Sequence, residues 1–440
     1  MISKHLIDRL KLSRTASLLS ILGLLVSCTG YYDASTRRPS TPEAASTSPA
    51  AAPTVASAPA PQTPPAPAAT PAPAPPPPIV PFDQAVLNAA NALLGNADLP
   101  GSPSTLPLVI DPLIDGVTGA QTRATQLIGN RLAGLIREKY PRFEVRKFSS
   151  ANVAKSPLVL IGTFTGVNNQ RQTAGKREAY RICLALADLK TGKLVSKGLA
   201  FAQMDGVDST PLAYFQDAPA WTEDPATLGY VRTCQGTRAG DPINAAYVDR
   251  ILVASMISDA IDAYDLGRYA DALALFQDAA RTSGGRQLRV LNGIYQASWK
   301  LGRGTQAAEA FGDIVDFGLE SKRLATMILF RPGSTSFIAD TRVSGAYPMW
   351  LKEIAARAAT GPACLEIVGN TSATGPEPLN ERLSQLRAEY VKSELERQNP
   401  ALRQRTIAYG VGSRATLVGN GRDDATDAID RRVVFIVTAC

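Results

Sequence analysis

The sequence predicts a multidomain α+β protein in which two sheet-containing domains flank a short helical segment. Residues 81–240 hold several strand-like runs around one clear helical pattern, which predicts an α+β domain. Residues 241–322 read as helices with an internal repeat. Residues 323–440 alternate strands and helices again, which predicts a carboxy-terminal α/β sandwich. Residues 1–27 and 28–80 precede these domains as an export signal and a tether.

The first residues have the layout of a secretory signal, because basic residues precede an apolar run at 18–26. This run is too short to span a bilayer as a helix. The segment Leu25-Val26-Ser27-Cys28 resembles the lipobox of bacterial lipoproteins. That resemblance implies that the signal is cleaved before Cys28. Cys28 then becomes the amino-terminal residue and is acylated, and palmitate is one of the acyl chains. Thr29 stands where aspartate is associated with inner-membrane retention, so we expect an outer-membrane anchor facing the periplasm. The competing interpretation is an ordinary cleaved signal with an unrelated cysteine.

The tether is defined by its composition. From about Ser40 to Pro78 nearly every residue is Pro, Ala, Thr or Ser, which cannot bury a core and favours extended polyproline states. At about 3.1 Å per residue, roughly forty residues reach on the order of 100 Å. We therefore expect residues 28–80 to be a disordered arm.

The formal net charge of +7 includes four basic residues of the signal, so no nucleic-acid partner is expected.

The domain at 81–240 opens with an amphipathic stretch from Phe82 to Leu94. Its main helix is predicted at Gln121 to Tyr140, where apolar residues recur at helical spacing. One helix on an antiparallel sheet is the expected layer. Its strands are predicted at Leu106–Ile114, Phe143–Phe148, Leu158–Phe164, Tyr180–Leu189 and Leu194–Ala202.

A hairpin turn joins the last two of these strands at Asp188-Leu189-Lys190-Thr191-Gly192-Lys193. The order of elements and this Asp-x-x-Thr-Gly-Lys hairpin resemble the domain shared by penicillin-binding-protein activator lipoproteins and curli-type export lipoproteins. The resemblance implies a periplasmic module that binds other proteins, which the sequence does not identify.

Two stretches of the helical segment repeat at an offset of thirty-five residues, since Gly267, Ala272 and Phe276 recur as Gly302, Ala307 and Phe311. The first copy resembles the tetratricopeptide repeat, in which small residues let two helices approach and an aromatic ring fills the gap. The second copy is degenerate. Two copies need a neighbour to bury their faces, so we expect them to pack on an adjoining domain. An unrelated helical hairpin is the competing interpretation.

Four cysteines follow Cys28 in a chain with an export signal, so two disulfides are expected. Four cysteines allow three connectivities, and the sequence does not choose among them. Because two cysteines fall in each apparent domain, we favour Cys183 with Cys234 and Cys364 with Cys440. The alternative is four buried free thiols.

Several blocks in the last domain resemble OmpA-like domains, which bind peptidoglycan. Residues 364–372 (CLEIVGNTS) match the family's strand and the loop that ends in Gly-His-Thr-Asp. Residues 380–391 have the spacing of its main helix, and 407–412 (IAYGVG) match its conserved strand and glycine turn. Asp430-Arg431-Arg432-Val433 stands where the family has Asn-Arg-Arg-Val. The resemblance implies an α/β sandwich with helices on one face of a mixed sheet.

The family's ligand is diaminopimelate of the peptidoglycan stem, whose zwitterionic end requires one cation and one anion. Arg387 holds the position of the carboxylate-binding arginine, whose planar fork donates two parallel hydrogen bonds. Ser372 replaces the aspartate that pairs with the ligand ammonium, and Asn370 replaces the preceding histidine. The expected peptidoglycan-binding residues are Asn370, Thr371, Ser372, Asn380, Arg387, Asp430 and Arg432.

Two interpretations of the missing aspartate remain open. In one, an acid of the cluster Asp423, Asp424, Asp427 and Asp430 takes its place, with Asp430 favoured, and weak peptidoglycan binding persists. In the other, the cluster is a solvated turn and the domain has become a structural or protein-binding unit. Arg431 and Arg432 then serve as sheet-edge charges that contact only solvent.

The sequence offers no catalytic constellation. The single histidine is His5 in the signal, so the mature chain has no imidazole for general-base catalysis or metal ligation. The cysteines lack metal-binding spacing, and no phosphate-binding glycine motif occurs in strand-to-helix context. We therefore expect no enzyme activity, no cofactor and no metal.

Together these features predict a lipid-anchored adaptor that docks on peptidoglycan and presents protein-binding modules in the periplasm. The alternative is a structural subunit of an envelope-spanning export or surface assembly, whose last domain no longer binds peptidoglycan. A third class, an enzyme acting on the cell wall, would require turnover of peptidoglycan by the purified chain.

Overall fold

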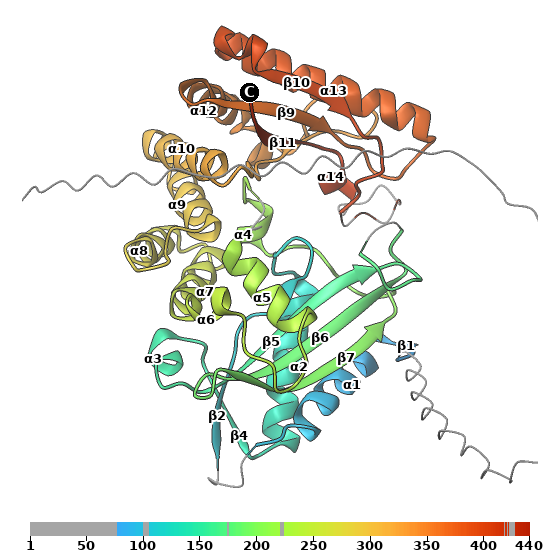
Figure 1. The fold of residues 1–440 in the computed structure, drawn as a ribbon, viewed down its shortest axis with the longest axis vertical. Coiled ribbons are helices and arrows are strands. Elements are labelled where there is room, and N and C mark those ends of the chain that lie inside the picture. Colours follow the sequence, from blue (N-terminus) through green and yellow to red (C-terminus); the bar gives the residue numbers. More distant parts are fainter. Residues whose placement is uncertain are drawn as a thin grey trace, which may run out of the picture. The chain divides into compact units, whose positions relative to one another are not determined.

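The amino-terminal module is built on a mixed sheet (Figure 1). The computed structural model describes residues 77–99, 105–173, 176–220, 224–417, 419, 421 and 427–440. Within these residues the strands follow the order β1-β7-β6-β5-β2-β4, with β3 beside β5. Their bounds are β1 Ile79–Val80, β2 Leu106–Ile110, β3 Ile114–Asp115, β4 Phe143–Arg146, β5 Leu158–Val167, β6 Ala179–Asp188 and β7 Lys193–Ala202.

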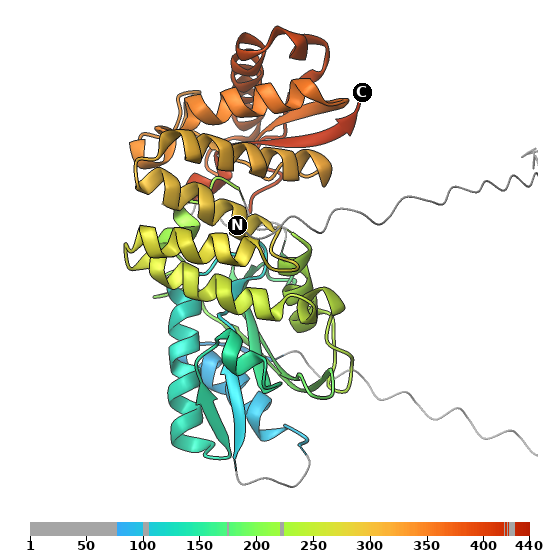
Figure 2. The ribbon, with the colours of Figure 1, turned by 90° about the vertical axis from the view of Figure 1, so that its left-hand side faces the viewer.

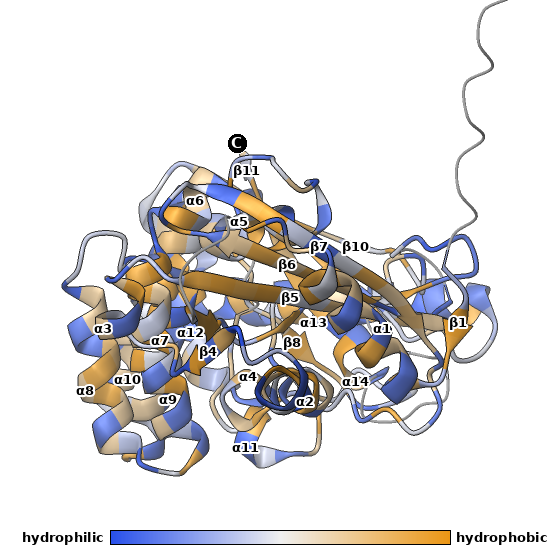
Figure 3. Cartoon of the chain, turned by 90° about the horizontal axis from the view of Figure 1, so that it is seen from below, coloured by the Kyte–Doolittle hydropathy of each residue, from blue (hydrophilic) through white to orange (hydrophobic). Residues whose placement is uncertain are grey.

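Helices cover both faces of this sheet, because its central strand is apolar on both sides. Every residue of β5 is buried, and β5 and β6 are coloured hydrophobic along most of their length in Figure 3. Helices α1 (Phe82–Gly95) and α2 (Arg123–Lys139) pack on one face through Leu93 and Ile128. The other face meets Tyr230, Tyr247 and Ile251, which come from α5 (Pro225–Gln235), α6 (Ala245–Val248) and α7 (Ile251–Asp265).

Three expectations for this module are corrected. The sheet is mixed rather than antiparallel, since β5, β6 and β7 are antiparallel while β1, β2, β3 and β4 pair in parallel. A second helical layer covers it, made of α5, for which no helix was predicted, and of α6 and α7, which belong to the segment predicted to be helical. The strand predicted at Leu106–Ile114 breaks after Ile110, where Pro112 has no amide to donate. The predicted helix and hairpin are confirmed, with α2 starting at a Thr122–Thr125 capping box.

Four antiparallel helices follow, namely α7, α8 (Tyr269–Ala280), α9 (Leu288–Lys300) and α10 (Gly304–Glu320). Gly267 and Gly302 adopt φ of +73° and +70° in the two equivalent turns, a conformation that favours glycine. Phe276 and Phe311 are fully buried at the equivalent positions. The helices therefore form two similar hairpins (Figure 2), and their relation to tetratricopeptide repeats stays a prediction.

The helical segment shares a core with the carboxy-terminal domain. Helix α10 packs against α12 (Tyr347–Thr360), where the rings of Phe311 and Trp350 stack at 5.2 Å. These rings belong to the same hydrophobic cluster as Ile367 and Phe435 of the last sheet. The expectation that the repeats need a neighbouring domain is met here. Residues Pro73–Cys440 form one compact unit, and the domain boundaries at 240 and 322 stay predictions.

The carboxy-terminal domain is an α/β sandwich with a mixed sheet, as predicted. Its strand order is β10-β9-β11-β8, with β9 and β10 parallel and β11 antiparallel to both of its neighbours. Buried Ile354 of α12 and Val391 of α13 face the same core as Leu365 and Ile367 of β9. The bounds are β8 Ile328–Leu329, α11 Thr341–Ser344, β9 Ala363–Gly369, α13 Glu377–Gln398, β10 Thr406–Gly410, α14 Asp427–Asp430 and β11 Arg432–Ala439.

Two disulfides confirm the favoured pairing. Cys183 of β6 is joined to Cys234 of α5, with their Cα atoms 6.2 Å apart. Cys364 at the start of β9 is joined to Cys440, with their Cα atoms 5.0 Å apart. Each disulfide thus links elements of one sheet-containing module.

No helix in the described part of the chain is long and apolar enough to cross a membrane.

Candidate functional site

The site begins with the close approach of α13 to two strands. A Cβ atom at Gly369 of β9 would lie 1.8 Å from the Ser384 carbonyl oxygen, and one at Gly410 of β10 would lie 2.3 Å from the Gln385 nitrogen. Both glycines are therefore needed for the helix to lie this close. The Ser384 hydroxyl accepts a hydrogen bond from the Gly412 amide over 2.9 Å. This contact fixes the turn after β10 against the helix.

Arg387 lies one helical turn beyond Ser384, and its side chain is fully buried. Its guanidinium donates from Nε to the Ser334 carbonyl over 3.0 Å, from Nη1 to the Asn370 carbonyl over 3.0 Å, and from Nη2 to the Arg331 carbonyl over 2.8 Å. The Phe330 ring centre lies 5.3 Å from the guanidinium carbon, within the range of a cation–π contact. Three of the five N–H donors are thus used within the chain.

Burial and the nearby Arg431 lower the pKa of Arg387 to about 10. Desolvation is the larger cause, because a buried cation loses the hydration that stabilises its charged form. The group still carries its charge at neutral pH. Arg387 is therefore a buried cation surrounded by carbonyl oxygens, with two N–H donors not engaged by the described residues.

The loop after β9 supplies the next three predicted residues. Asn370, Thr371 and Ser372 are all buried, with 2%, 2% and 5% of their surfaces exposed. The Asn370 amide group donates to the Val368 carbonyl over 3.1 Å, and the Thr371 backbone amide donates to the Gly412 carbonyl over 2.9 Å. The Thr371 hydroxyl is buried and has no hydrogen-bond partner among the described residues. The loop that accepts a hydrogen bond from Arg387 through the Asn370 carbonyl thus contains one buried hydroxyl that no described residue satisfies.

The Asp430 carboxylate binds backbone amides of the preceding loop, and its role toward a ligand stays a prediction. This carboxylate accepts hydrogen bonds from the backbone amides of Leu417 over 2.5 Å and of Gly419 over 2.8 Å. It also lies 3.5 Å from Nη1 of Arg432, with both side chains buried. Burial raises the pKa of Asp430 in spite of these contacts. Its carboxylate therefore holds the backbone at Leu417 and at Gly419.

The interpretation of the acidic cluster as a solvated turn is wrong for the two members that the structure describes. Asp427 is as fully buried as Asp430, and it accepts from the Gly421 amide over 3.0 Å. Arg431 and Arg432 are only 6% and 5% exposed, so they do not contact solvent alone. Carboxylates that accept backbone amides order a turn from inside. Asp423, Asp424 and Cys28 lie outside the described residues.

Four of the predicted residues form a connected set, and Asn380 lies apart from them. Arg387 donates to the Asn370 carbonyl, and the backbone amide of Asn370 donates to the Arg432 carbonyl over 2.8 Å. The Arg432 guanidinium in turn forms an ion pair with Asp430. Asn380 lies nearly two turns before Arg387 on α13. Its side chain donates to the Gly375 carbonyl over 3.5 Å, so it stabilises the entry to the helix.

Sequence reasoning missed the acceptors contributed by the loop after β8. The Arg331 and Ser334 carbonyls come from residues more than fifty positions before Arg387. Pro332-Gly333 is a turn signal that could have located this loop, and Gly333 has a φ of +58°.

The described residues contain no group of three or more His, Cys, Asp or Glu side chains that could hold a metal ion.

The site is a cluster of buried polar side chains in a mixed α/β domain. Solved structures that are similar to part of the chain offer comparisons. A peptidoglycan-associated lipoprotein from Burkholderia pseudomallei is 26% identical over 26% of this chain and 89% of its own, at a TM-score of 0.23. The cell wall anchor of the T6SS from Pseudomonas aeruginosa is 20% identical over 30% of this chain and 97% of its own, at a TM-score of 0.22.

An OmpA-like domain from Francisella tularensis subsp. tularensis SCHU S4 is 16% identical over 26% of this chain and 74% of its own, at a TM-score of 0.19. All three similarities cover less than a third of the chain. No protein-family model matches the chain, and no curated protein sequence matches it.

Proposed function

We propose that this chain is a cell-wall-associated adaptor without enzyme activity. A lipid on Cys28 anchors it in the outer membrane, the Pro/Ala arm spans part of the periplasm, and the last domain contacts peptidoglycan. The other modules present surfaces to periplasmic proteins. The observation that carries this proposal is the buried cation Arg387 beside the 370–372 loop, in a domain whose sequence blocks resemble OmpA-like domains.

The chemistry of the site fits half of a zwitterionic ligand. A carboxylate of diaminopimelate would accept hydrogen bonds from the two N–H groups of Arg387 that no described residue engages. The Thr371 hydroxyl, which lacks a partner among the described residues, would add a further hydrogen bond. The ligand ammonium would meet the Ser372 hydroxyl instead of a carboxylate, which removes an ion pair. Binding is therefore weaker than in a site that keeps the aspartate.

A second candidate function is supported by the acceptors of Arg387. Because three backbone carbonyls already hold the guanidinium, the arginine stabilises the fold whether or not a ligand is present. In this account the domain is a structural unit of an envelope assembly, and the three modules contact only proteins. The two candidates differ in whether the wild-type chain binds purified sacculi.

Sedimentation with purified sacculi tests the proposal, with the mature chain carrying Cys28→Ser so that lipid does not contribute. We expect the wild-type chain to pellet weakly, Ser372→Asp to pellet several-fold more, and Thr371→Val to pellet less. The matched control is Ser393→Asp, which adds the same charge at an exposed position of α13. If the wild-type chain stays in solution and only Ser372→Asp pellets, the second candidate replaces the first.

A further inference from the structure

A buried arginine of the amino-terminal module contacts the loop that follows β10. Arg177 lies just before β6 and is only 6% exposed. Its guanidinium donates to the Gly166 carbonyl of β5 over 2.9 Å and to the Thr173 carbonyl, which fixes it within its own module. It also donates to the Leu417 carbonyl, 240 positions further along the chain. Arg177 therefore joins the two sheet-containing domains.

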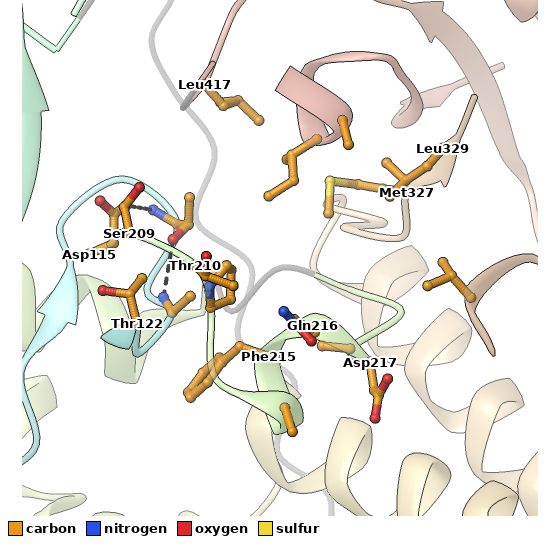
Figure 4. Close-up of a pocket in the computed structure, with 18 of the residues that line it drawn as sticks. Asp115, Thr122, Ser209, Thr210, Phe215, Gln216, Asp217, Met327, Leu329 and Leu417 are labelled. Atoms are coloured by element: carbon orange, nitrogen blue, oxygen red, sulfur yellow. Dashed lines mark hydrogen bonds between the residues drawn. The ribbon is translucent and has the colours of Figure 1, made fainter. Parts of the chain in front are cut away.

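The loop at 413–417 has little hydrophobic anchoring of its own. None of its side chains is buried, and Arg414 and Ala415 are exposed. Leu417 also borders a cavity of about 520 Å³, and Figure 4 shows Leu417 and Phe215 on opposite sides of this space. A side chain that borders a cavity lacks packing contacts on that side. The position of Leu417 therefore depends largely on hydrogen bonds of its backbone.

Two charged residues of the candidate site around Arg387 hold the same loop. Asp430 accepts a hydrogen bond from the Leu417 amide over 2.5 Å. Arg432 donates to the Ala415 carbonyl over 3.0 Å. Leu417 is thus held through both of its backbone polar groups, by the carboxy-terminal domain at the amide and by the amino-terminal module at the carbonyl.

The charges around Arg177 favour this arrangement. Burial lowers the pKa of its guanidinium, and the carboxylates of Asp115 and Asp430 oppose that shift. Asp115 belongs to the amino-terminal module and accepts from two backbone amides of its own turn, over 2.9 and 2.7 Å. The Arg177 cation and the Asp430 carboxylate therefore attract each other from the two sides of Leu417.

We infer that Arg177 is a positioning residue through which the amino-terminal module orders the candidate site. It fixes the Leu417 carbonyl, and the loop in turn fixes the Asp430 and Arg432 side chains. The Arg432 carbonyl accepts from the Asn370 amide over 2.8 Å, so a displacement of Arg432 reaches the loop after β9. The effect of this ordering on peptidoglycan binding rests on the proposed function.

Hydrogen–deuterium exchange of the mature Cys28→Ser chain tests the positioning without any ligand. In Arg177→Met we expect exchange in peptides that cover 411–417 and 365–372 to rise about tenfold, because a hydrogen bond from a charged donor is lost. Peptides of α1 report whether the amino-terminal module remains folded, and their exchange should not change. Arg137→Met makes the same substitution at an exposed position of α2 and should leave all of these rates unchanged.

A second variant displaces the arginine and keeps every charge. A Cβ atom at Gly166 would lie 3.1 Å from Cδ of Arg177, so Gly166→Ala must shift this side chain. Exchange in 411–417 should again rise more than exchange in α1. The inference is overturned if exchange in 411–417 is unchanged in Arg177→Met. It is also overturned if α1 exchanges faster by the same factor in both variants, because the effect is then a general loss of stability.

Sedimentation with purified sacculi measures the effect on the site, in the Ser372→Asp chain that is expected to bind most tightly. Adding Arg177→Met should weaken pelleting several-fold, and adding Arg137→Met should not. Unchanged pelleting together with faster exchange at 411–417 and 365–372 would show that the loop does not act on the site, which overturns the inference. If the Ser372→Asp chain does not pellet at all, the proposed function fails, and exchange at 365–372 alone decides whether Arg177 orders the site.

Discussion

The Trp350 indole N–H donates to the Tyr295 hydroxyl over 2.7 Å, and this buried hydrogen bond links α9 to α12. Tyr295 belongs to the helical segment and Trp350 to the carboxy-terminal domain. Their rings lie 6.0 Å apart and both contact Phe311. A polar contact thus fixes the orientation of the aromatic cluster that the two parts share.

Removing this hydroxyl should destabilise both parts together. Tyr295→Phe leaves the Trp350 N–H buried without an acceptor, which costs about 1–3 kcal/mol. We expect one urea transition, shifted to lower concentration, when unfolding is followed by fluorescence and by circular dichroism. Tyr390→Phe removes a hydroxyl from a side chain that is 39% exposed and should change the free energy of unfolding little. Two separate transitions would show that the helices and the domain do not share a cooperative core.

Arg387 should contribute to stability as well as to binding. Arg387→Met keeps much of the side-chain volume but leaves three backbone carbonyls without their donor. We expect the free energy of unfolding to fall by about 3 kcal/mol or more. Arg382→Met on the exposed side of the same helix is the control. An Arg387→Met loss no larger than that of the control would mean that the carbonyls find other donors.

The stability of the amino-terminal module should depend on pH through Asp111. Burial raises the pKa of this carboxyl from 3.8 to about 7, although the Tyr247 hydroxyl donates to it over 2.8 Å. The unfolded chain therefore releases this proton at lower pH than the folded chain. The contribution of the protonated acid to the free energy of unfolding is therefore fully present below about pH 4. It is lost as pH rises toward 7, at up to about 1.4 kcal/mol per pH unit.

Asp111→Asn removes the titrating group while its side-chain oxygen can still accept from Tyr247. Urea unfolding at pH 4.5 and pH 7 should show a smaller loss of stability with rising pH in this variant than in the wild-type chain. The control is Asp98→Asn, at an exposed position after α1. If the wild type and Asp111→Asn have the same pH slope, the carboxyl is ionised in the folded protein and the assignment is wrong.

The disulfides should stabilise each module separately. Cys183 and Cys234 are separated by 51 positions, and Cys364 and Cys440 by 76. Loop-closure entropy then gives about 4 kcal/mol for each bond. The paired alanine variants Cys183→Ala/Cys234→Ala and Cys364→Ala/Cys440→Ala should each lower the melting temperature. Reductant should then lower the melting temperature of each variant less than that of the wild-type chain, because only one disulfide remains to be reduced. Peptide mapping without reductant checks the pairing directly, and any crossed pair would contradict it.

Local pattern was sufficient for much of the fold. The hairpin between β6 and β7 and the helix α2 follow from alternation, turn residues and helical spacing. Helix α5 was missed because it forms where Tyr230 finds the apolar second face of β5, and this contact is not visible in a sequence. Strand β1 has only two residues, which is too short for any periodicity to be visible.

The candidate site was predicted in part for a comparable reason. Arg387 and Asn370 could be aligned with a family pattern, and the structure places them in contact. The Pro332-Gly333 turn signal could have located the loop, but its Arg331 and Ser334 carbonyls could not be assigned to Arg387, because a backbone acceptor leaves no mark on residue identity. Asp430 is the favoured candidate for the missing aspartate because it stands where the family has asparagine, and the backbone amides of Leu417 and Gly419 that it binds are equally invisible in a sequence.

The packing of α10 on α12 has a mechanical consequence. Phe311, Trp350 and the last sheet share one hydrophobic cluster, so the chain has no weak hinge at this junction. A pull on the helical segment must be resisted by the core of the carboxy-terminal domain. If the chain is held at the membrane and at the cell wall, tension passes through this junction, and it will not be released there by the separation of two independent bodies.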